Sequence, residues 1–439
     1  MSKRYVFWRT PAGRPYRGGD EKHAPLELLA DIGTSATINK EGKPTWEAFG
    51  FHRLETAIRA RFVVLSPNGV ELNETDSWAI IWSAIRSVVQ KSGGQSPIRL
   101  RAFIEKANAS AASHFRTRPK EYVLVTSLSV KSFPATRLKV KNCEIVPLKR
   151  RGRRYPYPGV LRLQSRRTAF GRHVDTTEYQ FVRVRTAERT IHEAAQRALE
   201  ALDLLRGLWT LLATYGTWGM HWGSPEQKPL GVIHIGPVHT LHFPDGRLVG
   251  NTYWYQPHFA EDRKLFEPKK GWADIERYRR WATRRLHRLP FQQDIEDLII
   301  RYVNALDHAN LDVAFLQMWS ILEKLTNTVG ANYDETIRRA VWRFTDRRLA
   351  GEMLESLRLR RNQYVHAAKS PEDREQITYM VKDLVDPHLH DLIRNDFRVE
   401  SLEEYAACLA LPTDIKTLEK RQQQMRRAAR MLKRQGNRS

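Results

Sequence analysis

The sequence predicts a mixed fold, in which an α+β N-terminal region is followed by an all-α helical-bundle domain. Residues 121–133 and 137–148 are rich in β-branched side chains that alternate with polar ones, a pattern typical of paired strands. After Gly271, apolar residues instead recur at helical spacing almost to the C-terminus. A chain of 439 residues also exceeds what one core normally organises, so more than one domain is expected.

The N-terminal region should contain both kinds of element. The first 20 residues are basic, contain Gly and Pro, and predict a loose arm. The expected helices cover 46–64, 77–90, 98–115 and 186–213, and the expected strands cover 121–133, 137–148 and 179–185. Short strands are also expected at 229–236, 239–243 and 251–256.

The C-terminal region should be helical throughout. The expected helices cover 272–288, 291–308, 311–328, 333–347, 350–367, 371–394 and a tail near 412–434. The predicted organisation is a basic arm (1–20), a mixed α+β region suited to sensing or nucleic-acid binding (21–256), a connecting segment (257–289), a helical domain (290–400) and a basic helical tail (401–439).

The charge is large and unevenly distributed. The formal net charge is +24, which favours a polyanionic partner because clustered Lys and Arg release counterions from phosphate backbones. An anionic membrane surface is the alternative. Residues 1–289 carry 49 Lys and Arg against 26 Asp and Glu, whereas residues 290–400 carry 15 against 19 and residues 401–439 carry 9 against 4. The affinity for a polyanion should therefore come mainly from the first two thirds and the tail.

The strongest basic cluster is the connector 149–167, which holds eight basic residues and no acid. Basic side chains follow phosphates, and aromatic rings stack on unpaired bases. The candidate nucleic-acid-binding residues are Arg150, Arg151, Arg153, Arg154, Tyr155 and Tyr157. The alternative is a solvated loop that keeps the protein soluble.

The segment 355–376 carries the candidate chemistry. Ser370, Pro371 and Asp373 form a helix-start pattern, so the preceding helix should end just after His366, with Leu354, Leu357 and Tyr364 packed inward. In the last turn of a helix, His366 would be favoured as an imidazolium that can act as a general acid. The guanidinium of Arg361 can stabilise charge on a phosphorane. If RNA supplies its own 2′-hydroxyl as nucleophile, no metal is needed.

The spacing alone leaves alternatives open. Positions five apart lie about 140° around a helix and about 7.5 Å along it, so Arg361 and His366 need a cleft between helices or between two subunits. The other interpretation is that Arg361 pairs with an acid such as Glu355 and that His366 merely ends a helix. Only His366 follows an Arg with four intervening residues in a segment where that Arg is followed by Asn.

The segments LDVAFLQMWSILEKLTN (311–327) and RRNQYVHAAKS (360–370) resemble the HEPN superfamily, in particular its Apea-like branch. That resemblance implies a HEPN-like helical domain over 290–400 with an R-x4–6-H ribonuclease site. The implied catalytic residues are Arg361, His366 and Asn362, and Glu323 occupies the family's acidic helix position. It further implies a homodimer or higher homo-oligomer that cleaves RNA, of antiphage-defence or toxin-like abortive-infection type, whose activating phage or cellular factor the sequence does not identify.

The remaining expectations concern partners and cofactors. His234, His239 and His242 lie around Pro237 with no cysteine near, so they should be structural, and neither a metal nor a cofactor is expected. The two cysteines are far apart and no apolar run reaches the roughly 20 residues of a membrane span, so a cytoplasmic protein without membrane partner is expected. RNA, or another nucleic acid, is the expected partner. The rival function is a non-catalytic nucleic-acid-binding or sensor protein whose HEPN-like helices only dimerise.

Overall fold

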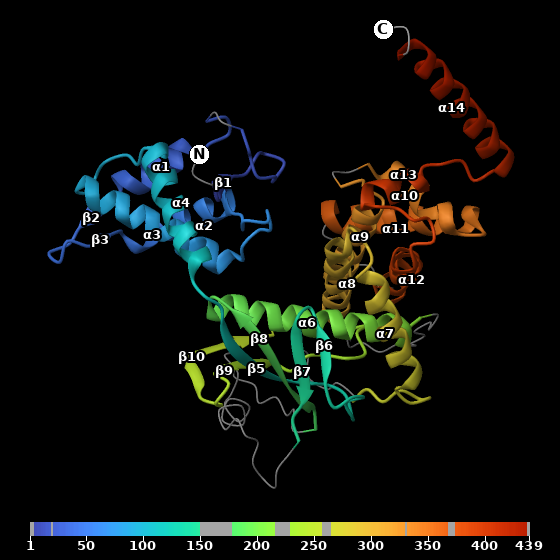
Figure 1. Cartoon of the computed structure of the whole chain (residues 1–439), viewed down its shortest axis with the longest axis horizontal. Coiled ribbons are helices and arrows are strands. Elements are labelled where there is room, and N and C mark those ends of the chain that lie inside the picture. Colours follow the sequence, from blue (N-terminus) through green and yellow to red (C-terminus); the bar gives the residue numbers. More distant parts are fainter. Residues whose placement is uncertain are drawn as a thin grey trace. The chain divides into compact units, whose positions relative to one another are not determined.

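The fold is mixed, with a sheet-containing region and a helical C-terminal region, as the sequence predicts at this level (Figure 1). The structure is a computed structural model that describes residues 4–18, 21–149, 178–215, 229–256, 265–329, 332–367 and 374–436. The chain divides into two compact units. Unit 1 comprises Met1–Leu124, Arg185–Ala198 and Leu241–Thr252, and unit 2 comprises Val125–Val184, Leu199–Thr240 and Tyr253–Ser439. The predicted connecting segment 257–289 falls inside unit 2.

Unit 1 is organised around helices and two short strand pairs. Its helices are α1 (Leu26–Thr34), α2 (Ala48–Arg61), α3 (Glu74–Ser92) and α4 (Leu100–Arg116). Strand β1 (Val6–Trp8) pairs antiparallel with β4 (Phe62–Val64), and β2 (Thr37–Ile38) pairs with β3 (Pro44–Thr45). Val6 and Trp8 are buried in the core beside Phe62 and Phe103, so this part of the predicted loose arm is in fact packed.

A six-stranded sheet has the order β10-β9-β5-β8-β7-β6. Its strands are β5 (Lys120–Leu128), β6 (Leu138–Val140), β7 (Cys143–Pro147), β8 (Gln180–Glu188), β9 (Val238–His242) and β10 (Leu248–Tyr255). The expected strand 137–148 is two antiparallel strands, because Lys141 and Asn142 adopt the positive φ angles of a tight turn. The expected strand at 229–236 is wrong, since only Ile235 makes a β-bridge there, to Leu128.

The long helix α6 (Ile191–Ala213) follows β8 and runs beside the sheet in Figure 1. Trp209 is fully buried on this helix, and its indole Nε1 donates to Glu276 Oε1 at 2.7 Å. Gly207 lies so close to Ile299 that an added Cβ would come within 2.5 Å of the Ile299 Cγ2 atom. A glycine is therefore required where α6 crosses α8.

The C-terminal region is helical, with most elements near their predicted positions. They are α7 (Ala273–Leu286), α8 (Gln292–Asp307), α9 (Leu311–Leu325), α10 (Tyr333–Ala340), α11 (Arg347–Ala367), α12 (Arg374–Arg394), α13 (Leu402–Leu409) and α14 (Ile415–Gly436). Helix α9 packs against both α8 and α12. The helix expected over 333–347 stops at Ala340 and continues only as a 3-10 turn, Val341–Arg343.

A buried polar cluster joins α6 to the C-terminal helices inside unit 2. The fully buried Arg206 donates to Asp307 Oδ2 at 2.8 Å and to Asp203 Oδ1 at 2.6 Å. His234 contacts the other oxygen of Asp307 through Nδ1 at 2.8 Å. The two carboxylates keep Arg206 charged by raising its pKa against the burial that lowers it. Residues of the predicted ranges 21–256 and 290–400 thus share one polar core.

Candidate functional site

Helix α11 carries the Arg-x4-His pair. At its first turn, the Leu349 amide donates to Asp346 Oδ1 at 2.9 Å. Leu354 and Leu357 are buried, as predicted. The described part of the helix reaches Ala367, one residue beyond His366, and the residues that follow lie outside the described part of the chain. The side chains of Tyr364 and His366, and the segment containing Ser370, Pro371 and Asp373, lie outside the described residues.

Arg361 is held against an aromatic ring rather than against an acid. Its guanidinium carbon lies 4.7 Å from the ring centroid of Tyr333, the first residue of α10. Its Nε atom is buried and has no hydrogen-bond partner among the described residues. Glu355 instead pairs with Arg358, which also donates to Asp334 Oδ1 at 2.9 Å. Among the described residues, the alternative pairing of Arg361 with Glu355 is therefore not observed.

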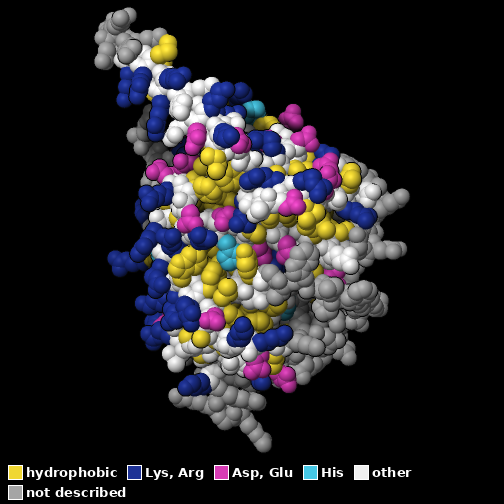
Figure 2. Space-filling view, turned by 90° about the vertical axis from the view of Figure 1, so that its right-hand side faces the viewer, with side chains coloured by type: hydrophobic (Ala, Val, Ile, Leu, Met, Phe, Trp, Pro, Cys, Tyr) yellow, Lys and Arg dark blue, Asp and Glu magenta, His cyan; other side chains and the backbone are white. Residues whose placement is uncertain are grey.

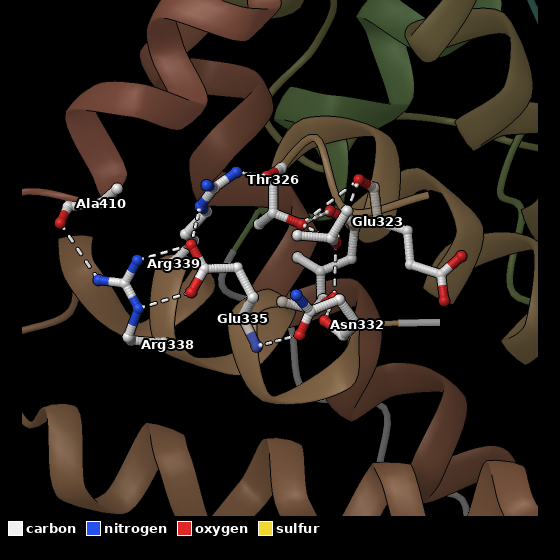
Figure 3. A network of polar contacts seen from close by, with 10 residues as sticks. Glu323, Thr326, Asn332, Glu335, Arg338, Arg339 and Ala410 are labelled. Atoms are coloured by element: carbon white, nitrogen blue, oxygen red, sulfur yellow. Dashed lines mark hydrogen bonds and ion pairs between the residues drawn. The ribbon is translucent and has the colours of Figure 1, made fainter. Parts of the chain in front are cut away.

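A polar network fixes the segment that presents Tyr333 (Figure 3). The Asn332 side chain accepts from the Glu335 amide at 3.2 Å, so it caps the start of α10. Glu335 pairs with Arg338 and Arg339, and Arg339 Nη1 reaches the Thr326 carbonyl at 2.7 Å. The α9–α10 connection is thereby tied to the helix that follows it.

Buried hydroxyls complete this network. Thr328 Oγ1 lies 2.9 Å from Thr326 Oγ1 and 2.6 Å from Thr336 Oγ1. Thr336 in turn donates to the Asn332 carbonyl at 2.9 Å. These hydrogen bonds hold the end of α9 against the first turn of α10, which fixes the ring on which Arg361 rests.

Glu323 and Trp319 lie on α9, and Trp319 also contacts Tyr333. Trp319 is buried and its ring centroid is 6.3 Å from that of Tyr333. The Trp319 Nε1 atom donates to Glu323 Oε1 at 2.9 Å. Glu323 thus supports a buried tryptophan whose ring contacts Tyr333, and Tyr333 in turn contacts Arg361.

The arrangement suits anion binding. Arg361 is half-buried, its position is fixed by a ring face, and no described carboxylate neutralises it. A guanidinium in this setting retains donors for the oxygens of a phosphate. Asn362 follows it on α11 and is also half-buried.

The candidate nucleic-acid-binding residues Arg150, Arg151, Arg153, Arg154, Tyr155 and Tyr157 lie outside the described residues. The C-terminal helix α14 is described, and its side chains from Lys416 to Lys433 are exposed except for the half-buried Leu418. Figure 2 shows Lys and Arg side chains along this helix at the top of the view. Within the described part of the chain, these cations form no ion pair.

The three histidines of the segment 234–242 each contact a different partner. His234 contacts Asp307, His239 Nδ1 lies 2.8 Å from Thr126 Oγ1, and His242 Nδ1 lies 3.0 Å from the Gly246 carbonyl. Burial lowers the pKa of His239 to about 3, so its ring is neutral. The described residues include no group of three or more His, Cys, Asp or Glu side chains that could hold a metal.

Tyr333 is the site residue that sequence reasoning missed. The segment Asn332-Tyr-Asp-Glu335 has the residues of a helix start, in agreement with the helix that the sequence predicts from residue 333. No spacing rule, however, relates an aromatic residue in the first turn of one helix to an arginine 28 positions later.

Comparison with family models, with curated proteins and with solved structures finds no match to this chain. No helix in the described part of the chain is long and apolar enough to cross a membrane.

Proposed function

We propose that this protein is a metal-independent endoribonuclease of the HEPN type that acts in antiphage defence or toxin-like abortive infection. The observation that carries the proposal is Arg361, a half-buried cation that rests on Tyr333 with no acidic partner among the described residues. It lies one and a half turns before His366 on the same helix. RNA is the proposed substrate, and a homodimer or higher homo-oligomer is the proposed active form.

The proposed reaction uses the nucleophile of the substrate. The 2′-oxygen of a ribose bonds to the adjacent phosphorus, and the bond from phosphorus to the 5′-oxygen breaks. The imidazolium of His366 donates a proton to the departing 5′-oxygen, while the proton of the 2′-hydroxyl passes to water. Arg361 stabilises the charge on the phosphorane, and Asn362 supplies a polar contact beside it. The products are a 2′,3′-cyclic phosphate and a 5′-hydroxyl.

We assign the affinity for RNA to basic surface outside residues 290–400, because that segment has a net charge of −4. The exposed cations of α14 are one part of that surface. A polyanion gains from contacts with such cations because counterions are released.

The test is RNA cleavage by variants of α11. Arg361→Ala and His366→Ala should each abolish cleavage without unfolding the protein. Arg348→Ala is the matched control, because Arg348 is an exposed arginine on the same helix. Circular dichroism and thermal unfolding establish that each variant is folded.

The same assay separates the rival function. A non-catalytic nucleic-acid-binding or sensor protein would bind RNA but yield no fragments with the parent chain. Cleavage at the parent rate by folded Arg361→Ala and His366→Ala variants would show that the site lies elsewhere.

A further inference from the structure

Helix α7 presents a row of arginines to solvent. Residues 269–288, which include this helix, contain eight Lys and Arg against two Asp and Glu, a net charge of +6. Arg277, Arg280 and Arg284 are exposed on the helix, and Arg288 is exposed in the turn that follows it. Positions three or four apart lie on one face of a helix. Arg280 and Arg284 are about 6 Å apart along the axis, close to the separation of neighbouring phosphates along one nucleic-acid strand.

Three arginines of this row are not neutralised. Arg277 pairs with Asp274 at 3.0 Å, at the start of the helix. The guanidinium groups of Arg280, Arg284 and Arg288 form neither an ion pair nor a hydrogen bond with any other residue that the structure describes. Their donors are therefore available to an anionic partner, and the release of counterions from a polyanion favours such contacts.

The inward face of α7 anchors the row in unit 2. Ile275 and Leu286 are buried, and so is Arg279. The Arg279 guanidinium donates to both oxygens of Glu276, at 2.8 Å and 2.9 Å. Glu276 also accepts from Trp209 Nε1 of α6 at 2.7 Å. The outward arginines take no part in these contacts, so they can be changed without disturbing the packing of the helix.

An aromatic residue interrupts the row on the same face. Trp281 lies four positions after Arg277 and three before Arg284, and it is half-buried. Its ring centroid is 5.5 Å from that of Tyr278, whose hydroxyl lies 2.9 Å from His390 Nδ1 on α12. Aromatic rings among cations are typical of surfaces that bind single strands, because the rings stack on unpaired bases while the cations contact phosphates. A duplex has no free base face to offer.

We infer that this face of α7 binds single-stranded RNA, with Arg280, Arg284 and Arg288 on the phosphates and Trp281 stacked on a base. The choice of RNA as the polyanion rests on the proposed function. The surface lies in the segment 257–289, which the sequence predicts only as a connection.

The experiment measures binding of a labelled oligouridylate to the full chain by fluorescence anisotropy over a range of salt concentrations. Its riboses carry 2′-O-methyl groups, so the 2′-oxygen cannot attack the phosphorus and binding is measured without cleavage. Changing Arg280, Arg284 and Arg288 together to Gln should weaken binding about tenfold or more near physiological ionic strength. The slope of log affinity against log salt concentration should become shallower by about 2, because each lost contact with a single strand removes about 0.7.

The matched control changes Arg338, Arg348 and Arg394 together to Gln. These are exposed arginines on other helices of the C-terminal region, so the variant loses the same charge at different places. Its affinity should stay within about twofold of the parent, because salt screens charges that do not contact the strand. Thermal unfolding establishes that both triple variants are folded.

Two variants of Trp281 test the stacking contact separately. Trp281→Leu should weaken binding about fivefold or more, because the stacking of one base is lost. The salt slope should not change, because no charge is removed. Trp281→Phe keeps a ring and should restore most of the affinity, which a merely structural role of the indole does not predict.

The assignment is overturned if the two triple variants bind alike, if the salt slope of the Arg280, Arg284 and Arg288 variant equals that of the parent, or if Trp281→Leu binds as tightly as the parent. Binding of the full chain to phosphatidylglycerol vesicles but not to the oligouridylate would also overturn it, in favour of an anionic membrane surface. The methylated strand reports binding alone, whereas the proposed function is tested by cleavage of unmodified RNA, so the two failures can be told apart.

Discussion

Removing the aromatic ring beneath Arg361 should impair RNA cleavage, whereas removing only the Tyr333 hydroxyl should not. The guanidinium lies 4.7 Å from the ring centroid, within the range of a cation–π contact. At a half-buried position such a contact contributes about 1 kcal/mol, between the exposed and the desolvated limits. If the contact holds Arg361 in its catalytic position, its loss in Tyr333→Leu should lower kcat/KM by about fivefold.

The assay compares cleavage of one RNA by the parent, Tyr333→Leu and Tyr333→Phe at equal folded concentration. Tyr333→Phe keeps the ring and should remain within about twofold of the parent. Tyr333→Leu also loses a ring contact with Trp319, so thermal unfolding must be measured to separate instability from a direct effect. The proposed role of the ring is refuted if Tyr333→Leu cleaves at the parent rate, or if Tyr333→Phe is as impaired as Tyr333→Leu.

Three other predictions use independent measurements. Cleavage should persist in EDTA and yield 2′,3′-cyclic phosphate ends; activity restored only by Mg²⁺ or Mn²⁺, or fragments with 3′-hydroxyl ends, would contradict the proposed mechanism. Changing Arg150, Arg151, Arg153 and Arg154 to Glu in the full chain should weaken RNA binding and make it less dependent on salt. The slope of log affinity against log salt concentration should become shallower by about 0.9 per lost phosphate contact for a duplex, or about 0.7 for a single strand. An unchanged slope would remove this connector from the interface, and cleavage at saturating RNA should survive the change. His388→Gln should make the free energy of unfolding fall less steeply in acid. Burial lowers the pKa of His388 from 6.5 to about 3, so the stabilisation by its neutral ring is complete above pH 6.5. This stabilisation is lost as the pH falls towards 3, at about 1.4 kcal/mol per pH unit. Equal slopes for the parent and His388→Gln in denaturant titrations at pH 4–6 would refute this.

Elements defined by local pattern were predictable from the sequence. The buried positions of Leu354 and Leu357 follow from helical periodicity and were expected. Long-range partners were not expected. The segment Phe62–Val64 continues the apolar pattern of α2, but it becomes strand β4 because it pairs with Val6–Trp8, more than 50 residues earlier.

In the candidate site, too, the sequence predicts the local spacing but not the long-range contacts. The Arg361–His366 spacing could be found in the sequence, and so could the acid nearest to Arg361. That Glu355 pairs with Arg358 instead depends on the directions of side chains around α11. The support of Arg361 by Tyr333 depends on how α10 packs beside α11, which is fixed by the buried threonine hydroxyls and the Asn332 cap rather than by any local motif.

The cluster around Arg206 has a consequence for how unit 2 opens. Arg206 on α6 and Asp307 at the end of α8 are buried together, so separating the two helices would break a buried ion pair. Amide hydrogens in the middle of these two helices should therefore exchange with solvent through one shared opening of the unit, not through two independent ones. For the same reason, a chain cut between residues 257 and 289 should yield two pieces that each aggregate or unfold when expressed alone, and that recover protection when they are refolded together.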